Sequence, residues 1–145
     1  SGGARVGRAD ARLGSGVRRR MSGVTLDAGP LIQLDHNQRK VIALLVLAEE
    51  SGSAVVVPGA ALTQAIRNPA RQARLARLLR QPRTEVVALD RVDATSVGRL
   101  LAASGTSDIA DAHVVVCARR AGTAVVTSDP EDLRALDHDL ALITV

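Results

Sequence analysis

The 145-residue sequence contains no phenylalanine, tyrosine or tryptophan. A hydrophobic core must therefore be built from leucine, valine, isoleucine and alanine, and the 46% hydrophobic content is enough for one ordinary domain. Without aromatic rings the protein cannot stack nucleic-acid bases on a platform, so any contact with a nucleic acid must use charge or hydrogen bonds.

Cysteine and long apolar runs are also scarce. The single cysteine, Cys117, cannot form an internal disulfide and lies in an apolar helical run, which indicates a reducing compartment and a place in the core. The longest apolar run, residues 41–48, is too short to span a membrane. We therefore expect a soluble, cytoplasmic protein.

The sequence lacks a glycine-rich phosphate loop, and its three histidines show no spacing that supports a zinc site. His113 points about 200° away from Asp111 around the predicted helix, which favours a packed or surface histidine over a metal ligand.

Acidic residues are unevenly placed along the chain. Residues 1–20 hold six arginines against one aspartate, and the remaining residues, with 13 basic and 14 acidic side chains, are close to neutral. We predict a flexible Arg/Gly-rich leader over 1–20 and one folded domain over 21–145. The leader is interpreted as an upstream extension, with a basic arm that touches RNA as the alternative.

No acid lies between Glu50 and Glu85, where six arginines occur. Spacings of four and three predict that Arg67, Arg71 and Arg74 share one face of a helix. Such a face suits a polyanion, because each neutralised phosphate releases counterions, although a merely solvated face is the alternative.

Short apolar runs alternate with helical patterns along the rest of the chain. Strands are predicted at 23–26, 54–57, 84–89, 123–127 and 140–145, and helices at 29–35, 38–51, 59–68, 70–81, 93–104, 107–121 and 130–136. This alternation predicts an α/β fold, a three-layer α/β/α sandwich with a parallel sheet of about five strands.

Aspartates occur just beyond the carboxyl ends of the predicted strands, where the functional residues of such a sheet usually lie. Asp27 follows the first strand, Asp129 follows the fourth, and Asp108 and Asp111 open an apolar helix for which Ser107 is the expected N-cap. Several carboxylates in one place repel unless a cation lies among them, and oxygen ligands suit Mg²⁺ or Mn²⁺. Turn or capping roles are the alternatives for each acid except Asp111, which has no expected capping role.

Four passages together resemble the PIN domain, specifically the small VapC-type toxins of bacterial toxin–antitoxin systems. They are "TLDAGPLI", "VVVPGAALTQAIR", "DIADAHVV" and "VVTSDPEDL", and the resemblance covers essentially all of residues 23–145. It implies the PIN fold and a Mg²⁺- or Mn²⁺-dependent endoribonuclease that cleaves cellular RNA of the tRNA or rRNA class and is neutralised by a cognate antitoxin.

The resemblance also implies roles for particular residues. Asp27, Asp111 and Asp129 would be catalytic metal ligands with Asp108 as an auxiliary acid, and Gln64 stands where the family usually carries a glutamate. The hydroxyls of Thr127 and Ser128 would support the metal or the phosphate, and Arg67 and Arg71 would hold flanking phosphates.

Two functional alternatives remain at this stage. Because Gln64 loses a charge, metal binding should weaken, and a catalytically weakened PIN domain that binds RNA or antitoxin is the second hypothesis. A receiver-like phosphoprotein is a minor third one. A homodimer is expected, and the apolar segment 41–48 is interpreted as part of an antitoxin groove, a homodimer face or a core helix.

Overall fold

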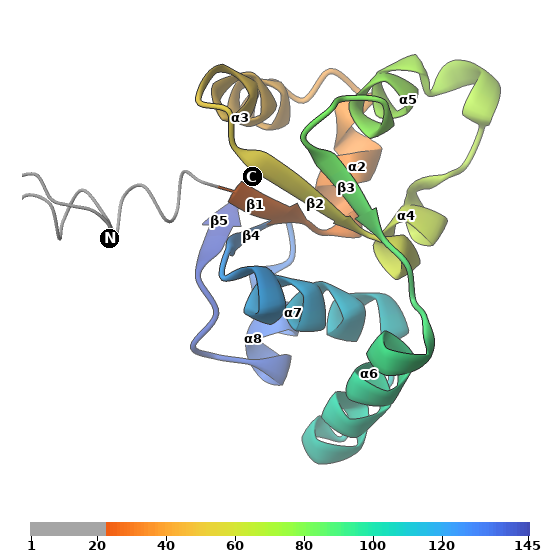
Figure 1. Ribbon diagram of the computed structural model, residues 1–145, viewed down its shortest axis with the longest axis vertical. Helices are drawn as coiled ribbons and strands as arrows, with labels where there is room; N and C mark the ends of the chain where they lie inside the picture. The colour runs from red at the N-terminus through yellow and green to blue at the C-terminus, as the bar shows by residue number, and fades with distance from the viewer. Residues whose placement is uncertain (1–22) are drawn as a thin grey trace, which may run out of the picture.

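Five parallel strands form a single sheet in the order β3-β2-β1-β4-β5 in the computed structural model, which describes residues 23–145 (Figure 1). The strands are β1 (Gly23–Leu26), β2 (Ala54–Pro58), β3 (Thr84–Val87), β4 (Ala124–Thr127) and β5 (Leu142–Thr144). The predicted fold class is therefore confirmed, whereas the predicted leader over 1–20 lies outside the described residues.

Helices cover both faces of this sheet, as parallel strands require. One face carries α2 (Ala28–Leu34), α3 (Arg39–Glu50) and α5 (Ala73–Leu79), and the other carries α6 (Arg91–Ser104), α7 (Ile109–Ala121) and α8 (Pro130–Leu136). The short helix α4 (Gly59–Ala65) follows β2 directly and contacts both α2 and α7 at the carboxyl edge of the sheet.

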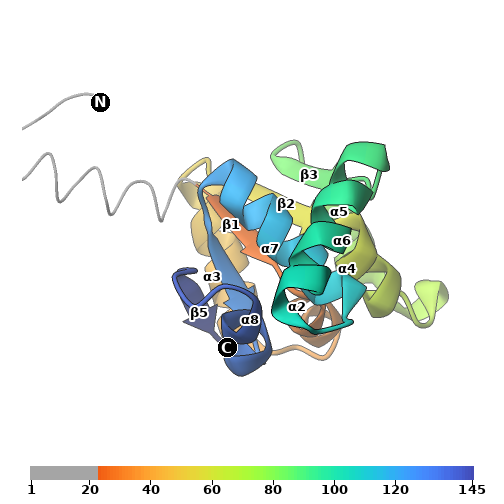
Figure 2. The same cartoon turned by 90° about the horizontal axis from the view of Figure 1, so that it is seen from below.

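The apolar character of α7 follows from its central position. It lies across β1 and β2 with α6 beside it (Figure 2), and it also contacts α4 and α8. Ala112, Val114 and Val115 are completely buried, and so is His113. A helix enclosed on this many sides needs apolar residues around most of its circumference.

The arginine-rich segment differs from the prediction of two long helices. The helix α4 ends at Ala65, and a short 3₁₀ helix (Pro69–Arg71) precedes α5. Proline has no N–H and disfavours the helical conformation in the residue before it. The side chain of Gln72 stabilises the break, because it accepts from the N–H groups of Arg67 and Asn68 and donates to the carbonyl of Ala65.

The prediction that Arg67, Arg71 and Arg74 share one helical face is therefore wrong. Arg67 follows α4, Arg71 lies in the 3₁₀ helix, and Arg74 lies in α5. All three are exposed. Separately, none of the helices within residues 23–145 has the length and apolar character needed to cross a membrane.

Candidate metal site

The first aspartate, Asp27, is a buried carboxylate that follows β1 directly, with 5% of its surface exposed. Its N–H donates to the carbonyl of Val126 at 3.0 Å, which extends the parallel ladder past the strand. Its Oδ1 accepts from the N–H of Ala28 at 2.9 Å, and its Oδ2 accepts from the hydroxyl of Thr127 at 2.8 Å. Asp27 therefore caps α2, as a turn residue would, and is also held in one orientation by β4.

Asp108, and not Ser107, is the N-cap of α7, so the predicted cap is wrong by one residue. Asp108 has an extended backbone, and its Oδ1 accepts from the N–H of Asp111 at 2.8 Å. A carboxylate at this position also interacts favourably with the helix dipole. Asp111 is thereby placed in the first turn and half-buried, with its own carboxylate not used for capping.

The hydroxyl of Thr127 connects two of the candidate aspartates. It donates to Asp27 and accepts from the N–H of Asp129 at 2.9 Å, and Thr127 itself is completely buried. Asp129 occupies the N-cap position of α8 but forms no side-chain capping hydrogen bond, and it is exposed. The capping alternative therefore does not account for Asp129. The hydroxyl of Thr127 is therefore hydrogen-bonded to both of these residues, and its contact with a metal or a phosphate stays a prediction.

Burial and neighbouring carboxylates raise the pKa values of two aspartates at this edge, Asp111 and Asp27. Burial raises the pKa of Asp111 to about 7, and the charges of Asp108, Asp27, Asp132 and Asp129 contribute to the shift. Burial also raises the pKa of Asp27, and the charges of Asp129 and Asp108 add to it. These shifts mean that the ionised side chains are close enough to repel one another, and a cation among them would relieve that repulsion.

Asp132 was not predicted as part of this site. It lies in the first turn of α8, and the sequence indicates only a capping role at its spacing of three from Asp129. Its charge contributes to the raised pKa of Asp111, so the two carboxylates lie near each other although they come from different helices.

The remaining predicted residues are less closely connected to the aspartates. Gln64 lies in the last turn of α4 and is exposed, and its side chain forms no hydrogen bond with any residue of 23–145. The helix that carries Gln64 begins directly after Pro58. In the register of β1 and β2, Thr25 lies opposite Val56, so Pro58 comes opposite Asp27 when the pairing is extended. The side chains of Arg67 and Arg71 form no ion pair with these aspartates in residues 23–145. Ser128 is partly buried and lies over Gly29, where an added Cβ would overlap its hydroxyl.

The donor set fits a hard divalent cation. All candidate ligands are carboxylate or hydroxyl oxygens, as Mg²⁺ and Mn²⁺ prefer. The aspartates do not form a closed ligand cluster, since the group in residues 23–145 whose ligand atoms lie within 4.8 Å of one another is Asp93, His113 and Cys117. A more open arrangement suits Mg²⁺, which usually keeps several bound waters.

The cluster of Asp93, His113 and Cys117 contains a carboxylate already paired with Arg120, and it does not fit a cation. Arg120 donates two hydrogen bonds to Asp93, at 2.7 and 2.9 Å, and holds the pKa of Asp93 at about 2. Burial raises the pKa of the Cys117 thiol to about 11, so the thiolate that a metal requires is disfavoured. His113 is completely buried, so of the packed and surface positions that the sequence left open it takes the packed one. The role of Asp93 was not predicted.

The fold and the site together define a class of protein: a parallel α/β sandwich with carboxylates gathered at one edge of its sheet. The PIN domain model matches residues 24–139, and the chain belongs to the PIN-domain family. PIN domains are typically metal-dependent nucleases.

A solved structure with a similar fold is that of VapBC2 from Rickettsia felis bound to a DNA fragment from their promoter. The match has a TM-score of 0.61 and 14% sequence identity, and it covers 85% of this chain and 98% of the other. At this identity the likeness shows the fold. No curated protein matches the chain.

Proposed function

We propose that the protein is a Mg²⁺- or Mn²⁺-dependent endoribonuclease of the VapC toxin type, acting on cellular RNA of the tRNA or rRNA class. The observation that carries the proposal is the gathering of aspartates at one edge of the sheet: Thr127 joins Asp27 to the backbone of Asp129, and Asp108 caps the turn that holds Asp111. The raised pKa of Asp111, caused by burial and by four neighbouring carboxylates, supports it. A protein keeps such mutual repulsion at one site when a cation or a reaction requires it. Membership of the PIN-domain family supports the same conclusion.

Asp27, Asp111 and Asp129 would hold the cation, with Asp108 and Asp132 at the rim. A bound Mg²⁺ would neutralise charge on the phosphoryl group and lower the pKa of a water molecule. Asp27 cannot rotate, because Thr127 and the N–H of Ala28 hold its two oxygens. A preorganised carboxylate loses little entropy when a ligand binds, so this residue orients the site.

The exposed arginines beyond α4 would bind the RNA backbone on either side of the cleaved bond. Arg67 and Arg71 are exposed and have no acid within their own segment to neutralise them. Contacts of this kind depend on charge and carry no base specificity. The absence of aromatic residues from the whole chain means that base stacking contributes nothing.

Gln64 favours a second candidate function, a catalytically weakened PIN domain that binds RNA or antitoxin. An amide oxygen remains at this position but the charge is lost, and no other acid lies between Glu50 and Glu85 to replace it. Metal affinity would then rest on the aspartates alone.

Mn²⁺ titration and cleavage of labelled RNA by three proteins would separate these functions. The wild type, Gln64→Glu and Asp111→Asn are compared at pH 8, where Asp111 is ionised. We expect cleavage by the wild type, tighter Mn²⁺ binding by Gln64→Glu, and no metal-dependent cleavage by Asp111→Asn. Cleavage only after the glutamate is introduced would support the binding module instead, and activity of Asp111→Asn would remove Asp111 from the mechanism.

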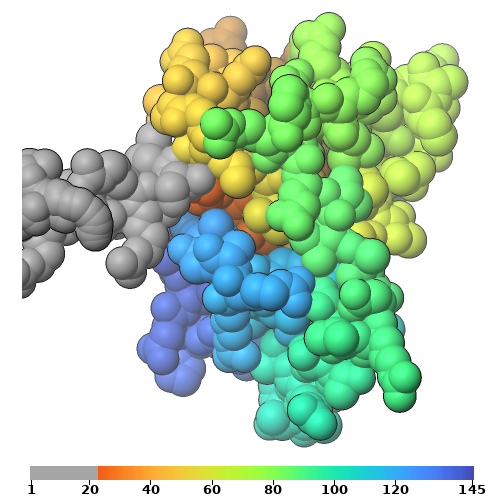
Figure 3. All heavy atoms as spheres, in the orientation of Figure 1, coloured from red at the N-terminus to blue at the C-terminus, as the bar shows by residue number. Residues whose placement is uncertain are grey.

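The cognate antitoxin would bind in a groove between α3 and α5, two helices whose surfaces are neighbours in Figure 3. The groove has a volume of about 620 Å³ and is lined by Leu34, Ile42, Leu45, Val46, Glu49, Arg74, Arg77, Leu78, Gln81, Pro82 and Arg83. An apolar floor with arginines beside it fits an acidic amphipathic segment.

The position of the groove bears on the alternatives for the apolar segment 41–48. Val41 and Ala48 are buried in the core, whereas Ile42, Leu45 and Val46 line the groove. One helix therefore serves both as a core element and as a wall of the groove. The expected homodimer stays a prediction.

A further inference from the structure

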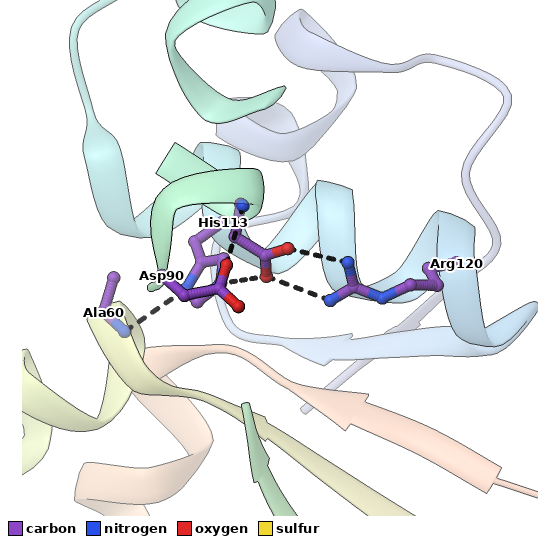
Figure 4. Close-up of polar contacts among 5 residues, drawn as sticks. Ala60, Asp90, His113 and Arg120 are labelled. Carbon is purple, nitrogen blue, oxygen red and sulfur yellow. Dashed lines mark hydrogen bonds and ion pairs between the residues drawn. The ribbon is translucent and has the colours of Figure 1, made fainter. Parts of the chain in front are cut away.

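His113 lies between two helices and forms a hydrogen bond with each of them. Its Nδ1 accepts from the backbone N–H of Ala60 in α4 at 3.3 Å, and its Nε2 lies 2.9 Å from Oδ2 of Asp93 in α6 (Figure 4). A backbone N–H can only donate, so Nδ1 must carry a lone pair and Nε2 must carry the proton. The two contacts together therefore specify the neutral Nε2–H tautomer.

Asp93 and Arg120 hold the imidazole in this tautomer. Asp93 is 2% exposed, and Arg120 donates to both of its oxygens. The ionised carboxylate can only accept, so it requires the proton on Nε2 of His113. The hydrogen bond made by one ring nitrogen fixes which nitrogen carries the proton, and this decides whether the other nitrogen donates or accepts.

The N–H of Ala60 belongs to the first turn of α4, a helix that has no capping side chain of its own. Its N-cap is Pro58, which forms no side-chain capping hydrogen bond. The first N–H groups of a helix have no partner within the helix, and a buried one without a partner is costly. His113, from α7, supplies the missing acceptor.

We propose that His113 is a positioning residue that caps α4 from α7 and thereby sets where Gln64 lies relative to the aspartates. Asp111 precedes His113 by two positions on α7, and Gln64 follows Ala60 by four positions on α4. One side chain therefore connects the helix that carries an aspartate of the site to the helix that carries Gln64. The functional consequence rests on the proposed nuclease site, whereas the cap itself does not.

The cap is tested directly in the full-length wild-type protein by ¹⁵N NMR of the histidine rings. We expect Nδ1 of His113 to be unprotonated and to show scalar coupling to the amide nitrogen of Ala60 across the hydrogen bond. One equivalent of Zn²⁺ should leave these signals unchanged. A protonated Nδ1, or a zinc-bound ring, overturns the proposal, because a neutral imidazole bound to metal through Nε2 carries its proton on Nδ1.

A pair of substitutions separates the cap from the rest of the network. His113→Asn keeps an acceptor near the position of Nδ1, whereas His113→Gln keeps a donor near that of Nε2 and loses the acceptor. We expect the amides of residues 60–62 to exchange about fivefold faster in His113→Gln than in His113→Asn, since a helix cap contributes about that factor. Equal exchange in the two variants, or faster exchange in His113→Asn, contradicts the proposal.

Mn²⁺ affinity connects the cap to the site. We expect His113→Gln to bind Mn²⁺ several-fold more weakly than His113→Asn, and the difference to vanish when Gln64→Ala is added to both variants. If the difference persists with Gln64→Ala, His113 does not act through Gln64. If the wild type binds no Mn²⁺, the proposed nuclease site fails, and the NMR and exchange measurements still decide whether the cap exists.

Discussion

The hydroxyl of Thr127 donates a 2.8 Å hydrogen bond to Oδ2 of Asp27, and the two residues are 100 positions apart in the chain. The parallel pairing of β1 with β4 brings them together, since Leu26 lies opposite Val126 in the register. The same hydroxyl accepts from the N–H of Asp129. A single buried side chain therefore orients one aspartate of the site and the backbone of another.

Replacing Thr127 by valine should weaken metal binding because it removes the donor from a buried carboxylate. The hydrogen bond from Thr127 lowers the pKa of Asp27, so its loss raises that pKa further and makes Mn²⁺ compete with a proton. We expect Thr127→Val to lose about 1–3 kcal/mol of stability and to require a higher pH for Mn²⁺ binding. Denaturant unfolding and Mn²⁺ titration at several pH values measure both effects.

Thr25→Val is the matched control for Thr127→Val. Thr25 is also a completely buried strand threonine, and its hydroxyl is hydrogen-bonded to that of Thr123 at 2.7 Å. It lies within β1, before the strand reaches Asp27. We expect this variant to lose stability without any change in Mn²⁺ affinity, and equal effects of the two variants on Mn²⁺ binding would contradict the role given to Thr127.

The stability of the metal-free protein should fall as the pH rises from about 4 to about 7. The folded pKa of Asp111 is about 7, against an ordinary value of 3.8, so in this range the folded protein holds a proton that the unfolded chain has released. The slope is less than about 1.4 kcal/mol per pH unit, because water screens a half-buried carboxylate. Denaturant unfolding between pH 4 and 8 in the presence of a chelator measures it.

Asp111→Asn should flatten this pH dependence, and the exposed Asp139→Asn should not. Excess Mn²⁺ should add more stability to the wild type at pH 8 than at pH 5, because the ion binds the folded state with Asp111 ionised. A pH dependence that is the same in Asp111→Asn and in the wild type would show that Asp111 is not the group responsible.

Gly29→Ala should displace the hydroxyl of Ser128. A Cβ at Gly29 would overlap that hydroxyl, whereas a Cβ at Gly98, within α6, meets nothing within 4 Å. We expect Gly98→Ala to raise the free energy of unfolding by about 0.5–1 kcal/mol from helix propensity alone. Gly29→Ala should gain less stability than Gly98→Ala. It should also cleave RNA more slowly, since Ser128 is proposed to contact the metal or the phosphate.

Thermal unfolding and RNA cleavage by the two alanine variants provide the comparison. If Gly29→Ala matches Gly98→Ala in both measurements, the contact between Gly29 and Ser128 has no functional importance.

Val46→Glu should weaken antitoxin binding because it places a charge on the apolar wall of the groove between α3 and α5. Val46 is 46% exposed and lines the groove, and Val92 on α6 is 67% exposed and lies outside it. We expect Val46→Glu to lower the affinity for the antitoxin at least about tenfold, as the burial of an unpaired charge in an apolar contact would. Titration calorimetry with purified antitoxin measures the change.

Val92→Glu is the control, and it should leave antitoxin affinity unchanged. Both variants should bind Mn²⁺ as the wild type does, because neither residue lies among the aspartates. A loss of antitoxin affinity confined to Val92→Glu would place the antitoxin on α6 instead.

The local pattern of the sequence determined much of the fold. Apolar β-branched runs specified the strands, and Gly105 and Gly122 specified helix ends, where both adopt positive φ angles of 72° and 68°. Asp27 and Asp129 could be predicted at the carboxyl edge because each directly follows a strand of a parallel sheet. These features depend on residues that are close in the chain, so periodicity and turn chemistry are enough to find them.

The tertiary structure decided what depends on residues far apart. Thr127 reaches Asp27, 100 positions away, only because β4 pairs with β1. His113 joins α7 to Asp93, 20 positions away, and to Ala60, 53 positions away. Hydrogen bonds of this range leave no repeating signal in the sequence, because packing, and not local geometry, brings their donors and acceptors together.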